Sequence, residues 1–165
     1  MLMVLHRQSM SGNLSVTLIV SGVILVIGST FLLFVLPSLA KPETKVFLGD
    51  GIFSADVALN QTARETGLSA KHSLQPGHVL LMAFPSEDKW GIWMKDMNFP
   101  IDIVWLNKDK KVIYVVMNAP PDDQGTIYRP NKLARYVVEL PAGTVSSKAI
   151  NTNNIATFDI SGEVN

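Results

Sequence analysis

A long uncharged apolar run near the amino terminus constrains this chain more than any other feature. No charged residue occurs between Gln8 and Ala40, and residues 14–36 read LSVTLIVSGVILVIGSTFLLFVL. As a helix, this run would extend about 34 Å, which exceeds the hydrocarbon core of a bilayer, about 30 Å thick. Its few Ser and Thr hydroxyls can donate to helix carbonyls, so they are compatible with lipid. We therefore predict a tail over residues 1–13, a transmembrane helix over 14–36 and a linker over 37–45.

A cleaved signal peptide is the alternative for the same segment. Residues 38–40 (SLA) place small side chains where a signal peptidase would cut, but the apolar run exceeds the roughly 7–15 residues usual in signal peptides. An uncleaved anchor is favoured, and the attachment of residues 1–40 is left open. Arg7 and Lys41 lie on opposite sides of the run, so the positive-inside rule barely discriminates between the orientations. The short tail resembles that of a signal anchor, which favours a cell-membrane protein with its carboxyl-terminal domain outside the cytoplasm.

The rest of the chain is balanced in charge. The sequence has 14 Lys and Arg against 14 Asp and Glu, and Arg7 is the only charged side chain before Lys41. A nucleic-acid-binding domain usually shows a basic excess on one face or in one run. The most basic run, residues 108–111 (KDKK), is typical of a hairpin turn. We therefore expect no nucleic acid as a partner. Because the chain has no cysteine, disulfides, thiolate metal sites and cysteine nucleophiles are excluded.

Short apolar segments separated by Gly, Pro, Asn and Asp predict a mostly β (α+β) domain over residues 46–160. The expected strands cover residues 46–48, 52–53 with an extension to 59, 79–84, 90–95, 101–106, 112–117, 134–140 and 155–160. Two short helices are expected, over 61–66 between an Asn60 or Thr62 cap and Gly67, and over 145–150. This set is typical of a compact β-barrel or sandwich-like domain. Residues 119–132 form a long loop, and 161–165 a frayed tail.

Residues 90–106 (WGIWMKDMNFPIDIVWL) hold all three tryptophans and set several polar groups among apolar neighbours. In an extended strand, Trp93 and Lys95 would point to the face opposite Met94. A cation beside a tryptophan plane can hold a sugar or a carboxylate, although a solvated loop charge is equally compatible with the pattern. Tryptophan is mostly a core residue, and Trp93 is the expected exception. Candidate ligand-binding residues are therefore Trp93, Met94, Lys95, Asp96, Asp102 and Arg135.

Asp102 lies in a strand whose other members are all apolar. A buried carboxylate must be paired or hydrogen-bonded. One hypothesis makes Asp102 a polar anchor of a binding groove or an acid–base group. The other makes it a structural clasp that accepts backbone N–H groups from residues 96–99 or pairs with Lys95, with Arg135 or Glu139 closing the network. We favour the clasp.

The sequence predicts no metal and no cofactor. His72 and His78 lie on either side of a Pro-Gly turn, but a metal site normally needs three or four converging ligands. No nucleophile elbow, zinc-protease motif or phosphate-binding glycine loop occurs.

Three runs of this sequence match motifs of a known family. Residues 92–97 (IWMKDM) follow an aromatic-Trp-Met-Lys-Asn/Asp-Thr/Met run, with Ile92 in the aromatic position, and residues 100–103 (PIDI) follow a Pro-Leu/Ile-Asp-Ile run. After Pro130, residues 134–143 follow Ala-Arg-Tyr-Val-Leu-Glu-x-x-Ala-Gly, with Val138 in the Leu position. On these motifs the chain resembles the domain of unknown function 192, over about residues 45–160. It departs from the family pattern at Ser69 and Lys71. The resemblance implies a compact, mostly β fold, often behind a signal peptide or membrane anchor, and it implies no reaction.

Our leading hypothesis is a membrane-anchored binding or accessory module for a cell-envelope glycan or peptide, because the chain lacks a nucleophile–base set. The alternative is a hydrolase that uses Asp96 and Asp102 as a carboxylate pair. That alternative predicts that Asp102→Asn abolishes turnover and leaves the melting temperature nearly unchanged. A third hypothesis, a purely structural envelope domain, predicts tolerance of every exposed substitution in the stretch.

Overall fold

The computed structural model describes residues 44–69, 71–121, 123 and 125–165, and the predicted membrane span over 14–36 lies outside them. Within these ranges, no helix is both long enough and apolar enough to cross a bilayer. The elements are β1 (Thr44–Leu48), β2 (Gly51–Ala58), α2 (Gln61–Thr66), β3 (His78–Asp88), β4 (Ile92–Trp93), β5 (Ile101–Leu106), β6 (Val112–Ala119), β7 (Ile127–Tyr128), β8 (Ala134–Pro141) and α3 (Thr144–Ser147).

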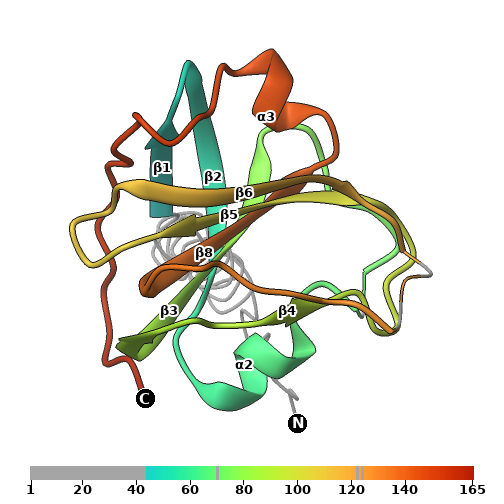
Figure 1. Ribbon diagram of the computed structural model, residues 1–165, viewed down its shortest axis with the longest axis horizontal. Coiled ribbons are helices and arrows are strands. Elements are labelled where there is room, and N and C mark those ends of the chain that lie inside the picture. Colours follow the sequence, from blue (N-terminus) through green and yellow to red (C-terminus); the bar gives the residue numbers. More distant parts are fainter. Residues whose placement is uncertain (1–43, 70, 122, 124) are drawn as a thin grey trace, which may run out of the picture. The chain divides into compact units, whose positions relative to one another are not determined.

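Six strands form one sheet in the order β1-β2-β3-β8-β5-β6, and β4 pairs with β7 in a separate two-stranded sheet (Figure 1). β2 and β3 are parallel, and α2 lies in the crossover that a parallel pair requires. The larger sheet is open, so the barrel, one of the two predicted architectures, is wrong. The expected closing strand over 155–160 makes only isolated bridges, from Ile155 to Lys111 and from Thr157 to Phe47, and two single bridges do not make a hydrogen-bonded ladder.

Each face of the larger sheet carries its own apolar cluster, because side chains alternate along a strand. Along β5, Val104 and Leu106 pack on one face, together with Val145 of α3. Ile103 and Trp105 pack on the other, with the residues that surround α2 and β4. In Figure 1, α2 lies close to β4, and α3 lies at the opposite end of the domain. The face next to α2 and β4 positions the site described below.

The mostly β class with two short helices is confirmed, and so are the bounds of two predicted elements. β5 covers residues 101–106 and α2 covers 61–66, where Asn60 Oδ1 accepts from Ala63 N at 2.9 Å as the N-cap. The strand predicted over 90–95 is only Ile92–Trp93, since the chain turns at Asp96, whose φ is 58°. The sequence analysis missed β7, which lies inside the predicted 119–132 loop and pairs with β4.

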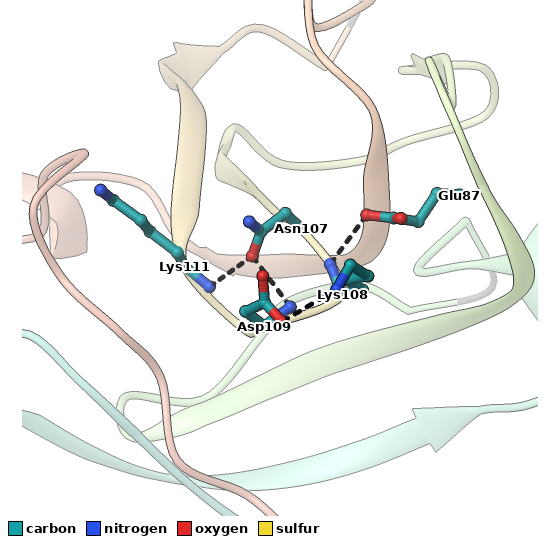
Figure 2. Close-up of polar contacts among 5 residues, drawn as sticks. All are labelled: Glu87, Asn107, Lys108, Asp109 and Lys111. Atoms are coloured by element: carbon teal, nitrogen blue, oxygen red, sulfur yellow. Dashed lines mark hydrogen bonds and ion pairs between the residues drawn. The ribbon is translucent and has the colours of Figure 1, made fainter.

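The basic run between β5 and β6 is the expected hairpin turn (Figure 2). Asn107 Oδ1 accepts from the backbone N–H groups of Asp109 (3.0 Å) and Lys111 (2.9 Å). Lys108 N donates to Glu87 Oε1 at 3.0 Å, which ties the turn to the end of β3. The residues of this run therefore serve the turn, and Asp109 forms an ion pair with Lys108 at 3.3 Å.

Candidate binding pocket

A pocket of about 590 Å³ opens on the sheet face next to α2 and β4. Its lining comes from α2 and the turn after it, the middle of β3, β4 with its flanking residues, the segment around β7, and β8. Ligand-binding pockets are commonly about 300–1,000 Å³ and largely apolar with a few polar groups. The size and the mixed lining therefore suit a small ligand or a short piece of a polymer.

Aromatic side chains form one wall of the pocket. Trp90 stacks on Phe84 with ring centroids 4.4 Å apart and an interplanar angle of 12°. Trp93 is 50% exposed, and Lys95 Nζ lies 5.3 Å from the centroid of its ring. Together these rings offer flat apolar surface beside a cation.

Gly91 allows β4 to approach the segment after β7 closely. A Cβ at this position would lie 2.7 Å from Ile127 Cγ2 and 3.1 Å from the guanidinium carbon of Arg129. A side chain at residue 91 would therefore push β7 and Arg129 away. The glycine thus helps to place Arg129 at the pocket, where its Nη1 donates to the carbonyl of Lys89 at 3.2 Å.

Arg64 of α2 reaches the pocket beside Phe84. Its Nη1 donates to the carbonyls of Leu59 (2.7 Å) and Ala83 (2.9 Å), and its guanidinium carbon lies 5.1 Å from the Phe84 centroid. Burial lowers the pKa of Arg64, and the charge of neighbouring Glu65 acts in the opposite direction. Arg64 Nη2 donates to Asn165 O at 2.8 Å, and Asn165 also lines the pocket. Among the described residues, neither Lys95 nor Arg129 forms an ion pair with an Asp or Glu carboxylate, so their charges are available to a ligand.

Glu139 of β8 is the buried acid of the pocket. It lies between Leu80 of β3 and Ile103 of β5 in the sheet register, and its side chain is only 4% exposed. Its Oε2 has no hydrogen-bond partner among the described residues. Burial raises the pKa of Glu139 to about 8. At neutral pH this carboxyl therefore carries a proton and can donate a hydrogen bond.

The structure brings some of the predicted site residues together. Trp93 and Lys95 both line the pocket. Asp96 is exposed and lines a second hollow that adjoins the first through Trp93 and Lys95. The long segment over 119–132 contributes Ile127 and Arg129 to the pocket. The predicted surface around Trp93 and Lys95 thus forms one side of a real concavity.

Other predicted site residues lie elsewhere. Met94 is fully buried in the apolar cluster. Arg135 does not line the pocket, and its Nη1 donates to the carbonyl of Pro85, which does. The expected network of Arg135 with Lys95 and Asp102 is wrong, because none of these three residues forms an ion pair among the described residues.

Asp102 is fully buried, and it acts as a clasp with partners other than those predicted. Its Oδ1 accepts from Asn118 N and its Oδ2 from Val145 N, both at 2.8 Å. The expectation that residues 96–99 or Lys95 would satisfy it is wrong, because side-chain alternation along β5 points Asp102 to the sheet face of α3. The carboxylate thus ties the start of α3 and the end of β6 to β5.

This placement separates the predicted carboxylate pair. Asp96 is exposed on the pocket side, whereas Asp102 faces the opposite side of the sheet with both oxygens engaged. A hydrolase of the predicted kind needs two carboxyl groups that flank one bond of the substrate. Asp96 and Asp102 therefore do not share a site.

The sequence analysis did not predict that three residues, Arg64, Arg129 and Glu139, would line a pocket. Glu139 was visible as one carboxylate in the apolar run 136–140 (YVVEL). Its alternation with Val137 places it on the face next to α2. No comparable signal marked the two arginines, since their approach depends on how α2 and β7 pack.

The fold and the larger pocket define the class of protein: a small, mostly β domain with an open sheet and a pocket of mixed polar and apolar lining. Residues 45–157 match the family described as an uncharacterised ACR, DUF192, and the chain belongs to this family. The UPF0127 protein of Pyrococcus abyssi is 31% identical over 90 residues, which cover 53% of this chain and 71% of that protein. A UPF0127 protein of Thermococcus gammatolerans is 27% identical over 85 residues, 50% of this chain and 53% of its own length.

Two crystal structures share the fold. One is a protein of Sinorhizobium meliloti described as a candidate transcription regulator, with a TM-score of 0.64 and 24% identity over 70% of this chain and 92% of that chain. The other is a protein of unknown function from Novosphingobium aromaticivorans, with a TM-score of 0.63 and 19% identity over 70% of this chain and 83% of that chain. At these identities the likeness concerns the fold alone.

Proposed function

We propose that the domain is a binding module that takes a cell-envelope glycan in the pocket beside Trp93. The observation that carries this proposal is the half-exposed Trp93 next to Lys95 at a pocket of about 590 Å³. Trp93 does not stand alone, because Ile127, its partner in the β4–β7 pair, is also about half exposed and lines the same pocket, and contiguous exposed apolar surface is typical of a binding site. The role is binding rather than hydrolysis, because the predicted carboxylates do not share a site.

A glycan suits this lining for two physical reasons. The C–H groups on one face of a pyranose ring are weakly positive, so they pack well on the electron-rich face of tryptophan. The polar groups at the same pocket, Lys95, Arg64 and Glu139, can donate to ring and hydroxyl oxygens. An extended peptide of the envelope is the competing ligand, and the same assay separates the two.

The test compares defined probes on the full chain. The protein is held in a polyoxyethylene detergent, because detergents with sugar headgroups would compete for the site. A β-1,4-linked N-acetylglucosamine disaccharide and a cell-wall stem tetrapeptide are titrated while tryptophan fluorescence is recorded. We expect the disaccharide to bind, and Trp93→Ala to weaken it about tenfold or more.

The matched control is Phe47→Ala, which removes another exposed aromatic side chain, on β1 and outside the pocket. It should leave disaccharide binding unchanged. Preferential binding of the tetrapeptide would transfer the role to peptide recognition. No binding of either probe above the Trp93→Ala variant would favour the purely structural domain.

We also propose that residues 14–36 hold this module at the cell membrane with the β domain outside the cytoplasm. The support is the length and apolarity of that run. In intact spheroplasts, an epitope tag at the carboxyl terminus should be cleaved by added protease, and the protein should stay in the membrane fraction after alkaline carbonate washing. A tag protected in intact spheroplasts but cleaved after lysis would reverse the orientation, and release by carbonate would remove the anchor.

A further inference from the structure

The pocket floor contains a buried acid whose hydrogen-bonding capacity is unused. Glu139 is 4% exposed, and its Oε2 meets no donor or acceptor among the described residues. Nearly all buried polar atoms in native proteins have a hydrogen-bond partner, so an unpaired one at the wall of a pocket indicates a partner supplied from outside the chain. Glu139 lines the pocket that contains Trp93, so the pocket is the side from which such a partner would come.

The protonation state of Glu139 determines which kind of ligand atom can form a hydrogen bond with it. Burial between β3 and β5 raises its pKa to about 8, so at neutral pH it is a donor as well as an acceptor. Its best partner in a low-dielectric site is an anionic oxygen, since hydrogen bonds to charged acceptors are about twice as strong as neutral ones.

The charges around the pocket have the sign that such a partner needs. α2 contributes Arg64 and Glu65, the segment after β4 contributes Lys95, and the segment after β7 contributes Arg129. The β3 part of the lining is apolar and contributes no titratable group. Glu65 is exposed and accepts a hydrogen bond from Gln61 at 2.7 Å. With Glu139 neutral, the described lining therefore carries an excess of positive charge.

Building on the glycan-binding role, we propose that the pocket recognises an acidic sugar. A carboxylate oxygen of the sugar accepts the proton of Glu139 at the pocket floor, the surrounding cations balance its charge, and the sugar ring packs against Trp93. A cationic sugar is disfavoured by the same cations, and a neutral sugar gains only the ring contact and weaker hydrogen bonds.

Three matched monosaccharides test this inference on the full chain in polyoxyethylene detergent. N-acetylmuramic acid equals N-acetylglucosamine with an added lactyl carboxylate, and glucosamine carries an ammonium group instead. Affinities are measured by tryptophan fluorescence at intervals between pH 6 and pH 9. At pH 6 we expect N-acetylmuramic acid to bind about tenfold more tightly than N-acetylglucosamine, with glucosamine weakest.

The pH dependence identifies the residue. As pH rises through about 8, Glu139 loses its proton and repels the sugar carboxylate, so the advantage of N-acetylmuramic acid should disappear. The Glu139→Gln variant keeps a donor and cannot ionise, so its preference for the acidic sugar should vary little with pH. Asp159→Asn, a carboxyl-to-amide change at an exposed position outside the pocket, should behave as the wild type.

The wild-type profile alone can overturn the inference, so the test does not depend on the folding of a variant. Equal affinity for the acidic and neutral sugars would refute carboxylate recognition and leave glycan binding standing. An affinity for glucosamine at pH 6 that exceeds those for the other two sugars would assign Glu139 to an ammonium group instead. Failure of all three sugars together with the disaccharide would overturn both the inference and the glycan-binding role.

Discussion

The protonation of Glu139 makes a quantitative prediction about the stability of the fold. Its pKa rises from 4.5 to about 8 on folding because the folded chain buries the carboxyl group. Below pH 4.5 the group is protonated in both states, and its contribution to stability is fully present. As pH rises toward 8, the unfolded chain loses this proton first, so the folded state is progressively destabilised.

The size of this effect follows from the shift in pKa. Each pH unit between the two values lowers the free energy of unfolding by about 1.4 kcal/mol, and the whole interval amounts to about 5 kcal/mol. Small domains have a total stability of about 5–15 kcal/mol, so the effect is large enough to measure. Glu139→Gln cannot ionise, and its stability should lack this component.

Urea unfolding of the wild type and Glu139→Gln at pH 5, 6, 7 and 8, followed by tryptophan fluorescence, measures the difference directly. The wild-type midpoint should fall relative to the variant by roughly 1–3 M between pH 6 and pH 8, given a urea dependence of about 1–3 kcal/mol per M. Other titrating groups affect both proteins equally, so they cancel in the comparison. Parallel pH profiles would refute the conclusion that burial keeps Glu139 protonated.

Three further predictions concern residues that stabilise the fold: the Asp102 clasp, the cap of α2 and the turn between β1 and β2. Asp102→Asn should lower the free energy of unfolding by about 3 kcal/mol, because an amide cannot accept well from two N–H groups, and an unchanged urea midpoint would contradict the clasp. Asn60→Ala should lower it by about 1 kcal/mol through loss of the α2 cap, as measured by thermal unfolding, whereas equal melting curves would show that the cap is dispensable. Gly49→Ala should lower it by about 2 kcal/mol or more, since φ is +56° there and a Cβ would lie 2.2 Å from the Lys148 carbonyl oxygen, and a stable variant in the same assay would show that the turn can relax.

Much of the fold could be predicted because local patterns determine it. The alternation of apolar residues in β5 and β8 fixed which side chains share a face, and β5 was predicted with its observed bounds. The N-cap at Asn60 also follows from side-chain chemistry that acts within one helical turn. The different exposures of Trp93 and Trp105 were expected from the neighbours of each residue.

The parts that failed depend on contacts between distant segments. Asp102 was expected to be a clasp, but its partners lie 16 and 43 residues away, on segments whose approach no local pattern encodes. Closure of the sheet depended on whether the segment over 155–160 would pair fully with both edges, and it makes one bridge to each. The sequence shows Glu139 in a strand, but its burial follows from the strand order that places β8 between β3 and β5.

The three tryptophans provide the most direct test of the central claim, that this pocket binds a glycan. The full chain is labelled with 5-fluorotryptophan, and its fluorine NMR spectrum is recorded while N-acetylmuramic acid is added at pH 6. Trp90 and Trp93 line the pocket and Trp105 is fully buried in the sheet. We expect the Trp93 resonance to shift most, the Trp90 resonance to follow, and the Trp105 resonance to stay nearly fixed. A spectrum in which no resonance moves, or in which all three move alike, would contradict the account.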